Sequence, residues 1–179
     1  MRLIRTFPAT IPFGRSYVVD DMERVVNSGY SYRGLAALGD DVVHLDWDQA
    51  VDRADLVRFV DRAKADPDRA RVVPVLVDLA ARPGLAAPVW NCRVYVGDRL
   101  RYVEPGDGTA DLFGFGMVYL PGKALAAFED RWRAELDDGS VRFDDTGFSG
   151  WYSKEYGPAV IDWDLHAVHL HYSVAGVPL

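Results

Sequence analysis

Residues 42–48 read VVHLDWD, an apolar run that ends in two aspartates separated by one tryptophan. The run is short and rich in β-branched residues, which is typical of a strand buried on both faces, as in a parallel sheet covered by helices. Side chains two apart in a strand point the same way, so Asp46 and Asp48 are expected to project together where the strand leaves the core. Ligands of open α/β sheets bind at such strand ends. The stretch therefore predicts an α/β fold with a carboxylate pair at a ligand site.

The segments that follow continue the alternation of strand and helix. Residues 54–67, ADLVRFVDRAKADP, carry apolar side chains at helical spacing and a proline that stops the helix. Residues 71–79, RVVPVLVDL, are a second candidate for a buried strand, and residues 92–105, CRVYVGDRLRYVEP, alternate like a hairpin around Gly97 and Asp98. We expect a mixed, mostly parallel sheet flanked by helices, formed by one domain over residues 1–179.

The second half of the chain predicts further strands and helices. A strand is expected up to Leu120, followed by a helix that opens near Pro121. One face of that helix would carry Leu125, Phe128, Trp132 and Leu136. A shorter helix is predicted from Thr146 through Trp151, with final strands in residues 159–164 and 166–174. Before residue 40, the segments 18–29 and 30–38 are predicted to be helical.

The composition limits what the protein can bind. The chain has 179 residues, of which 49% are hydrophobic and 26% charged, as in an ordinary globular protein. Its formal charge of -7 weighs against binding nucleic acid mainly through phosphates. Cys92 is the only cysteine, so any metal must be held by oxygen and imidazole ligands. No stretch approaches the roughly 20 apolar residues of a membrane span, and Pro8 and Pro12 lie where a signal peptide needs an apolar core, so we expect a cytoplasmic protein.

The aspartate pair and a cluster of histidines are the candidates for a metal site. Two ionised carboxylates this close repel each other unless a cation lies between them, and oxygen ligands suit Mg²⁺ or Mn²⁺. Asp48 can instead cap a following helix, with Asp46 as a solvated residue at the strand end. His169 and His171 share one face of a predicted strand whose other face is apolar, and imidazole with aspartate suits Mn²⁺. His44 and His166 are interpreted as structural.

Two further acidic segments have alternative interpretations. The word DWD recurs at residues 162–164, before a predicted turn, which favours a turn or capping role for Asp164 over direct chemistry. Asp144 and Asp145 precede the short helix at Thr146. They can cap that helix and complement its dipole, or one of them can serve as a general base or orient a hydroxyl nucleophile.

Four segments, in this order, resemble the GT-A type of glycosyltransferase related to the large family-two transferases. GDDVVHLDWDQAV (39–51) is similar to the D-x-D segment that ends a central strand, and GFGMVYLPGKAL (114–125) to the small-residue acceptor strand leading into a helix. DDTGFSGWYSKEYG (144–157) is similar to the acidic acceptor-site segment, and AVHLHYS (167–173) to the late histidine of the metal site. Together they cover about residues 30 to 175.

The resemblance implies a Rossmann-like GT-A fold and transfer of a sugar from a UDP- or GDP-linked donor to a hydroxyl acceptor. It implies that Asp46 and Asp48 bind Mn²⁺ or Mg²⁺ and the donor diphosphate, with Asp48 as the more direct ligand. His169 would complete the metal site, with His171 as the alternative. Asp145 matches the acidic residue that deprotonates the acceptor hydroxyl, and Asp144 is its neighbour.

The part before the D-x-D segment is short compared with the family. Because only 45 residues precede Asp46, we expect an abbreviated nucleotide-binding part, with Asp20, Asp21 and Arg33 as candidates for contacts to the base or phosphates. Gly114 and Gly116 would allow the backbone or a sugar to approach closely.

Two other functions fit parts of the pattern. A metal-dependent phosphoesterase or nuclease would use Asp46, Asp48, His169 and His171 around one or two ions. A non-catalytic module that binds nucleotides or carbohydrates would use exposed tryptophans, and the chain offers Trp47, Trp90, Trp151 and Trp163. Core packing is the alternative role for these four side chains. The acceptor of a transferase can be a polysaccharide, a small molecule, a protein or a DNA base, and the acidic charge does not favour nucleic acid.

Overall fold

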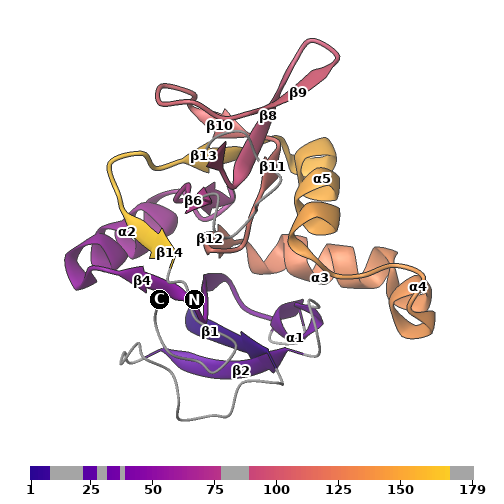
Figure 1. The fold of residues 1–179 in the computed structure, drawn as a ribbon. Helices are drawn as coiled ribbons and strands as arrows, with labels where there is room; N and C mark the ends of the chain where they lie inside the picture. Colours follow the sequence, from indigo (N-terminus) through magenta and orange to yellow (C-terminus); the bar gives the residue numbers. More distant parts are fainter. Residues whose placement is uncertain (9–21, 28–31, 37–38, 78–88, 170–179) are drawn as a thin grey trace.

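A seven-stranded sheet forms the centre of the protein, and the strand that carries the aspartate pair lies inside it. The computed structural model describes residues 1–8, 22–27, 32–36, 39–77 and 89–169 (Figure 1). The strand order is β10-β13-β5-β12-β3-β1-β2. In chain order these strands are β1 (Arg2–Pro8), β2 (Glu23–Asn27), β3 (Val42–Asp46), β5 (Arg71–Val72), β10 (Thr109–Ala110), β12 (Met117–Leu120) and β13 (Ala159–Ile161).

The sheet is mixed. β1 pairs with β2 and β3 in parallel, and β13 pairs with β5 in parallel. β12 runs antiparallel to both of its neighbours, β3 and β5, and β10 runs antiparallel to β13. The predicted mixed sheet flanked by helices is therefore present, with three parallel and three antiparallel pairings among the described strands of the central sheet.

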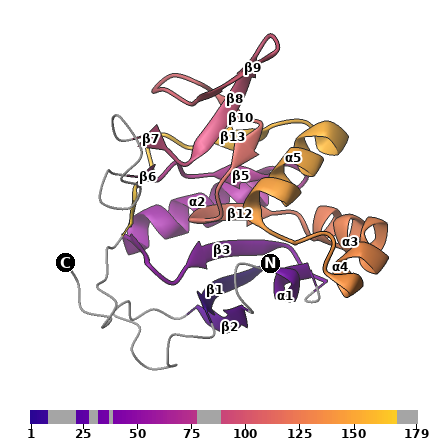
Figure 2. The ribbon, with the colours of Figure 1, turned by 45° about the vertical axis from the view of Figure 1, so that its right-hand side comes forward.

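Helices cover both faces of this sheet (Figure 2). Val43 and Leu45 of β3 share one buried cluster with Phe59 and Ala63 of α2 (Arg53–Ala65). Val42 points the other way, into a cluster with side chains of α3 (Gly122–Arg131) and α5 (Asp145–Tyr156). The first four residues of β3 are fully buried, as the apolar run at 42–45 predicts. α1 (Arg33–Ala36) and α4 (Arg133–Asp138) complete the helices of the described ranges.

Three small sheets extend the central one. The predicted hairpin around Gly97 and Asp98 is confirmed as β8 (Cys92–Val96) and β9 (Arg99–Tyr102), to which β11 (Leu112–Phe113) adds a strand. β14 (Ala167–His169) pairs with β4 (Gln49–Val51), and β6 (Leu76–Val77) pairs with β7 (Val89–Trp90). The pairing of β14 with β4 brings the histidine segment next to the end of β3.

The helix predicted over residues 18–29 is wrong in the part that the structure describes. Residues Glu23–Asn27 form β2, whose register with β1 pairs Val25 with Thr6. The adjacent Val25 and Val26 suit a strand at least as well as a helix, and pairing with β1 supplies the backbone hydrogen bonds. Of the helix predicted over 30–38, the structure describes residues 32–36, and α1 occupies Arg33–Ala36.

Other boundaries also differ from the prediction. The strand expected over 71–79 is interrupted after Val72, because Pro74 has no N–H to donate to a sheet. The apolar helical face predicted from Leu125 to Leu136 is divided at Trp132, where α3 ends and α4 begins. The helix after the aspartate pair is confirmed, but β4 precedes it and its N-cap is Asp52, whose side chain accepts from the N–H of Ala54 at 2.7 Å. Asp48 therefore does not cap it.

Two expectations about the whole chain have different outcomes. Within the described ranges, no helix has both the length and the apolar character that crossing a membrane requires. That residues 1–179 form a single domain stays a prediction.

Candidate functional site

The aspartate pair lies where β3 leaves the core, but its two members are held by different partners. Asp46 is the last residue of β3, whereas Trp47 and Asp48 form a turn before β4. The Asp46 carboxylate accepts hydrogen bonds from the Tyr32 hydroxyl at 3.0 Å and from the Thr6 hydroxyl at 3.2 Å. Asp48 Oδ2 lies 3.0 Å from Nε2 of His169. Asp48 is thus outside the strand, and its contact comes from β14.

Burial gives Asp46 an unusual affinity for a proton. Desolvation raises the pKa of its carboxyl to about 8, and the negative charge of Asp48 acts in the same direction. The hydrogen bonds from Tyr32 and Thr6 lower the pKa by less than these effects raise it. The side chain still has 23% of its surface exposed, so a ligand can reach it. At neutral pH Asp46 is therefore largely protonated.

Buried polar side chains hold the end of β3 in place. Arg5 is fully buried and donates through Nη1 to the carbonyl oxygens of Asp46 at 2.7 Å and Gln49 at 2.8 Å, which fixes the turn between β3 and β4. His44 is also fully buried, and its Nε2 lies 2.8 Å from the Thr6 hydroxyl oxygen. Burial lowers the pKa of His44 to about 3, so its ring is neutral. The structural interpretation of His44 agrees with this environment.

The second pair of acidic residues has two separate functions. Asp144 is the N-cap of α5, and its Oδ1 accepts from the N–H of Gly147 at 2.7 Å. Asp145 is the first residue of α5; its Oδ1 accepts from the N–H of Thr146 at 2.7 Å, and the residue lines a pocket. The negative charge of Asp145 raises the pKa values of Tyr32 and Asp46, though less than burial does, because it lies close to both groups. The structure thus brings Asp145 to the same region as the first pair.

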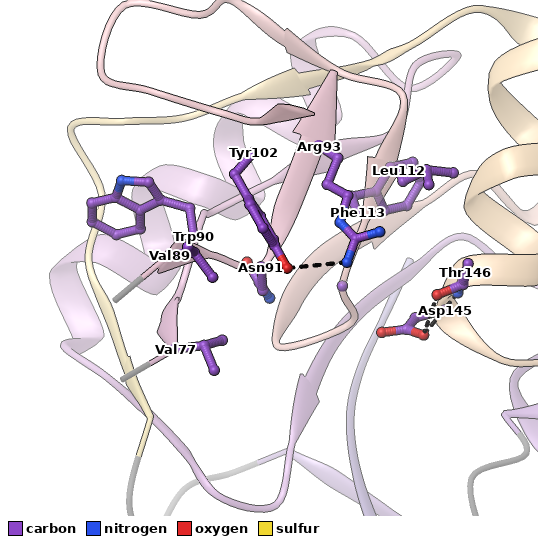
Figure 3. A pocket seen from close by; sticks show the side chains of 11 residues that line it. Val77, Val89, Trp90, Asn91, Arg93, Tyr102, Leu112, Phe113, Asp145 and Thr146 are labelled. Atoms are coloured by element: carbon purple, nitrogen blue, oxygen red, sulfur yellow. Dashed lines mark hydrogen bonds between the residues drawn. The ribbon is translucent and has the colours of Figure 1, made fainter. Parts of the chain in front are cut away.

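A pocket of about 140 Å³ opens beside Asp145 (Figure 3). Its polar wall residues are Asn91, Arg93, Tyr102, Asp145 and Thr146. Its apolar wall residues are Val77, Val89, Trp90, Leu112 and Phe113, and Gly114 completes the lining. Arg93 and Tyr102 come from the β8–β9 hairpin, whereas Asp145 and Thr146 come from the start of α5 (Figure 3).

The sequence did not reveal Asn91, Arg93 and Tyr102 as members of a site. One signal was present: a two-residue loop at Gly97 and Asp98 fixes the register of the hairpin and places Arg93 opposite Tyr102. The Arg93 guanidinium lies over the Tyr102 ring, 4.8 Å from its centre, and donates to its hydroxyl at 3.1 Å. That this pair faces Asp145 depends on how the hairpin packs against the rest of the protein.

Gly114 and Gly116, in the segment before β12, make close contacts with their neighbours. A Cβ on Gly114 would lie 2.6 Å from Nδ2 of Asn91, and a Cβ on Gly116 would lie 3.0 Å from a methyl group of Val75. The carbonyl oxygen of Gly116 accepts from the N–H of Asp46 at 3.1 Å. Backbone or a sugar is expected to approach these glycines; in the structure the nearest groups are side chains, those of Asn91 at Gly114 and Val75 at Gly116.

Arg33 lies in a set of ion pairs. Its Nη2 donates to Glu129 Oε1 and to Asp137 Oδ1, each at 2.7 Å. These carboxylates from α3 and α4 already neutralise the guanidinium proposed to contact a nucleotide. The other two candidates for that contact, Asp20 and Asp21, lie outside the described residues.

Three of the four predicted metal ligands, Asp46, Asp48 and His169, lie in the described residues. His169 meets Asp48 as described above, whereas His171 lies outside the described residues. The side chains of β14 alternate as predicted, but the apolar Val168 faces solvent and is 58% exposed, whereas His169 is partly buried. Among residues 1–8, 22–27, 32–36, 39–77 and 89–169, no three His, Cys, Asp or Glu side chains are grouped as metal ligands.

The repeated DWD word at residues 162–164 is part of an ion-pair network. Asp162 is 4% exposed and accepts from Arg62 at 2.9 Å and from Arg71 at 2.8 Å. Asp164 lies in a turn and pairs with Arg62 at 2.7 Å. The turn role favoured for Asp164 agrees with this position. His166, interpreted as structural, is exposed and donates its backbone N–H to Asp55 at 3.0 Å.

Of the four tryptophans considered for ligand binding, Trp90, Trp151 and Trp163 pack against the larger core cluster. The rings of Trp90 and Trp163 meet edge to face with centroids 5.3 Å apart, and Trp163 donates to the carbonyl oxygen of Asp107 at 2.6 Å. Core packing therefore describes Trp151. Trp90 also forms a wall of the pocket beside Asp145, and Trp90 and Trp163 together line a second pocket next to β14.

Comparisons with known proteins place the chain by its fold. No family model matches the sequence, and no curated protein matches it either. Among solved structures, a putative glucose-1-phosphate thymidylyltransferase from Bacillus anthracis, in complex with a sucrose, aligns at 15% identity with a TM-score of 0.48, over 87% of this chain and 60% of that chain. A197 from STIV aligns at 15% identity with a TM-score of 0.53, over 96% of this chain and 86% of that chain. The chain is thus similar to A197 in fold over almost its whole length.

Proposed function

We propose that this protein is a metal-dependent glycosyltransferase of the GT-A type, which moves a sugar from a nucleoside diphosphate to a hydroxyl acceptor. The contact between Asp48 Oδ2 and His169 Nε2, 3.0 Å apart, carries the proposal. These residues are 121 positions apart in the sequence, and the resemblance to the family pairs them in one metal site. The mixed sheet with helices on both faces supports the same assignment.

The donor atoms at this contact suit Mn²⁺ or Mg²⁺. A carboxylate oxygen and an imidazole nitrogen lie together at this contact, and both are ordinary ligands of these ions. Asp48 and His169 would hold the ion, and the donor diphosphate would supply further oxygen ligands. A divalent cation bound there would neutralise the charge that develops on the departing diphosphate.

The remaining residues of the site divide the work between donor and acceptor. Arg5 holds the turn that carries Asp48 through the carbonyl oxygens on either side of it. Asp46, buried and largely protonated, limits the negative charge that a diphosphate meets at the strand end. Asp145 lines the pocket where an acceptor would sit and would take the proton from the attacking hydroxyl. The new bond joins that oxygen to the sugar as the bond to the diphosphate breaks.

Thermal melts and product analysis test the proposal. UDP-glucose, GDP-mannose and related donors, each with Mn²⁺, are added to the wild type. We expect one of them to raise the melting temperature and to release its nucleoside diphosphate slowly, with water taking the sugar in the absence of an acceptor. Asp48→Asn and His169→Gln should lose the Mn²⁺-dependent shift. Asp164→Asn is the matched control, because it makes the same change in the repeated DWD word outside the site, and it should keep the shift.

Two results would overturn this assignment. The first is a wild type whose melting temperature no donor changes in the presence of Mn²⁺ and which releases no nucleotide. The second is hydrolysis of a simple phosphodiester that depends on Asp48, which would favour the phosphoesterase alternative.

A further inference from the structure

The pocket beside Asp145 has the size of a single ring. Its volume of about 140 Å³ is close to that of a cavity of about 150 Å³ that holds one benzene molecule. Trp90 and Tyr102 contribute aromatic rings to its walls, and Asn91 and Thr146 contribute hydrogen-bonding groups. This combination of flat apolar surface and a few polar groups suits one sugar residue.

One wall of the pocket carries a cation that has no acidic partner among the residues that the structure describes. Arg93 is half-buried, and within the described ranges its guanidinium forms no ion pair, although Arg33, Arg62, Arg71 and Arg101 all pair with carboxylates. Its described side-chain partner is the neutral Tyr102, which holds it by the hydrogen bond at 3.1 Å and by the ring beneath it. A guanidinium oriented in this way is a binding group for carboxylates and phosphates.

The pocket is therefore polarised, with Arg93 on the hairpin wall and Asp145 on the α5 wall (Figure 3). The chain as a whole has a formal charge of -7, which repels anions in general. A bound anion would be attracted to Arg93 and repelled from Asp145, so the pocket fixes the orientation of a substrate that carries one.

We infer that the acceptor is a monosaccharide-sized group bearing a carboxylate or a phosphate, with the anion at Arg93 and the reacting hydroxyl toward Asp145. The role as acceptor rests on the proposed function; the recognition of an anionic sugar does not. Arg93 is then a residue that determines specificity, and Tyr102 positions it.

Binding of simple sugars in the absence of metal and donor tests this inference. Glucuronic acid, glucose 6-phosphate and glucose are titrated into the wild type and followed by ligand-observed NMR or calorimetry. We expect at least one of the two anions to bind roughly tenfold or more tightly than glucose, and to lose affinity as salt is added. Which of the two is preferred tells a carboxylate from a phosphate acceptor.

Variants of the hairpin locate the effect. Arg93→Gln should bind the anionic and neutral sugars equally, and Arg93→Lys should keep part of the preference, because a lysine retains the charge without the planar pair of donors. Tyr102→Phe should weaken the preference for anionic sugars, because it removes the hydroxyl to which Arg93 donates. Arg99→Gln, which removes an exposed arginine from the same hairpin, is the matched control and should behave as the wild type. Circular dichroism checks that each variant is folded.

The outcomes separate this inference from the proposed function. Equal binding of glucose and both anions by the wild type, or a preference that survives Arg93→Gln, would overturn it even if a nucleotide sugar binds with Mn²⁺. A preference found only when UDP-glucuronic acid is compared with UDP-glucose would assign Arg93 to the donor sugar and overturn the acceptor role. If the wild type selects anions through Arg93 but does not respond to any nucleotide sugar, the anionic sugar site is supported and the proposed transferase function is contradicted.

Discussion

Asp46 and His44 lie two residues apart on β3, and burial shifts their pKa values in opposite directions. Both contact the Thr6 hydroxyl, so they share one polar environment inside the sheet. The pKa of Asp46 rises from an ordinary value of 3.8 to about 8, and that of His44 falls from 6.5 to about 3. In both cases the neutral form is favoured, because a charge is costly where water is excluded.

These shifts predict how the stability of the protein depends on pH. Between about pH 4 and pH 8 the native state holds a proton on Asp46 that the unfolded state has lost, so the free energy of unfolding falls as the pH rises. His44 acts in the opposite sense between about pH 3 and pH 6.5, since only the unfolded state then binds its proton. The two effects offset each other below about pH 6.5, and only that of Asp46 remains above it. We expect stability to decline between about pH 6.5 and pH 8.

Urea denaturation of the metal-free protein at several pH values measures this decline. Asp46→Asn should reduce it, because the amide stays neutral throughout, while Asp164→Asn should decline as the wild type does. A decline of the same size in Asp46→Asn would show that another group is responsible.

The neighbours Asp144 and Asp145 predict a separation of stability from activity. Asp144→Ala removes the N-cap of α5 and should lower the free energy of unfolding by about 1 kcal/mol, with turnover largely kept. Asp145→Asn should reduce turnover by roughly a hundredfold or more while donor binding and stability change little. Denaturation curves and steady-state rates on the two variants test this, and equal loss of turnover in both would contradict the assignment of Asp145 as the base.

At the scale of elements, the backbone at the start of α3 packs closely against the loop that leads into β3. A Cβ on Gly122 would lie 2.6 Å from the carbonyl carbon of Asp40 and 2.8 Å from the N atom of Asp41. The N–H of Gly122 also donates to the Asp41 side chain at 2.8 Å. The close contact involves backbone atoms, which cannot move aside as a flexible side chain can.

Gly122→Ala is therefore expected to lower the free energy of unfolding by about 1–3 kcal/mol, the usual cost of overpacking. Gly108→Ala is the control, since a Cβ there meets no atom within 4 Å, and it should be close to neutral. Urea denaturation of both variants provides the comparison. If Gly122→Ala leaves the free energy of unfolding unchanged, the backbone between β3 and α3 can shift to accommodate the methyl group.

Elements with strong local signals were predictable from the sequence. The apolar run of β3, the helical spacing of α2 and the glycine turn of the β8–β9 hairpin each specify a structure through neighbours in the chain. β2 and β4 were not predicted, because each depends on a partner strand from elsewhere, β1 and β14. The end of β5 at Val72 could have been predicted from Pro74, which has no N–H to donate to a sheet.

At the scale of the whole molecule, Asp162 ties three elements together. Its buried carboxylate follows β13 and accepts from Arg62 of α2 and Arg71 of β5. Arg62 also pairs with Asp164, so removing Asp162 leaves Arg71 without a described carboxylate partner, and breaking such a buried pair typically costs about 3–5 kcal/mol. The repeated DWD word thus has a structural function in its second copy.

We expect Asp162→Ala to destabilise the protein by about 3 kcal/mol or more. Asp164→Ala removes an aspartate from the same network, but one that is 58% exposed, and should cost no more than about 1 kcal/mol. Thermal and urea unfolding of the two variants measure the difference. Equal effects would contradict the central place of Asp162.

The sequence by itself determined the strand that ends in Asp46, the helix that follows it and the candidates Asp48, His169 and Asp145, because hydrophobic period, turn residues and residue type are properties of the local chain. Only the tertiary structure decided that Asp48 meets His169 across 121 positions, that Asp46 holds a proton while Asp144 caps a helix, and that Arg93 shares a pocket with Asp145. Distances between remote segments and the loss of water around a buried group arise from packing, and no local pattern encodes them.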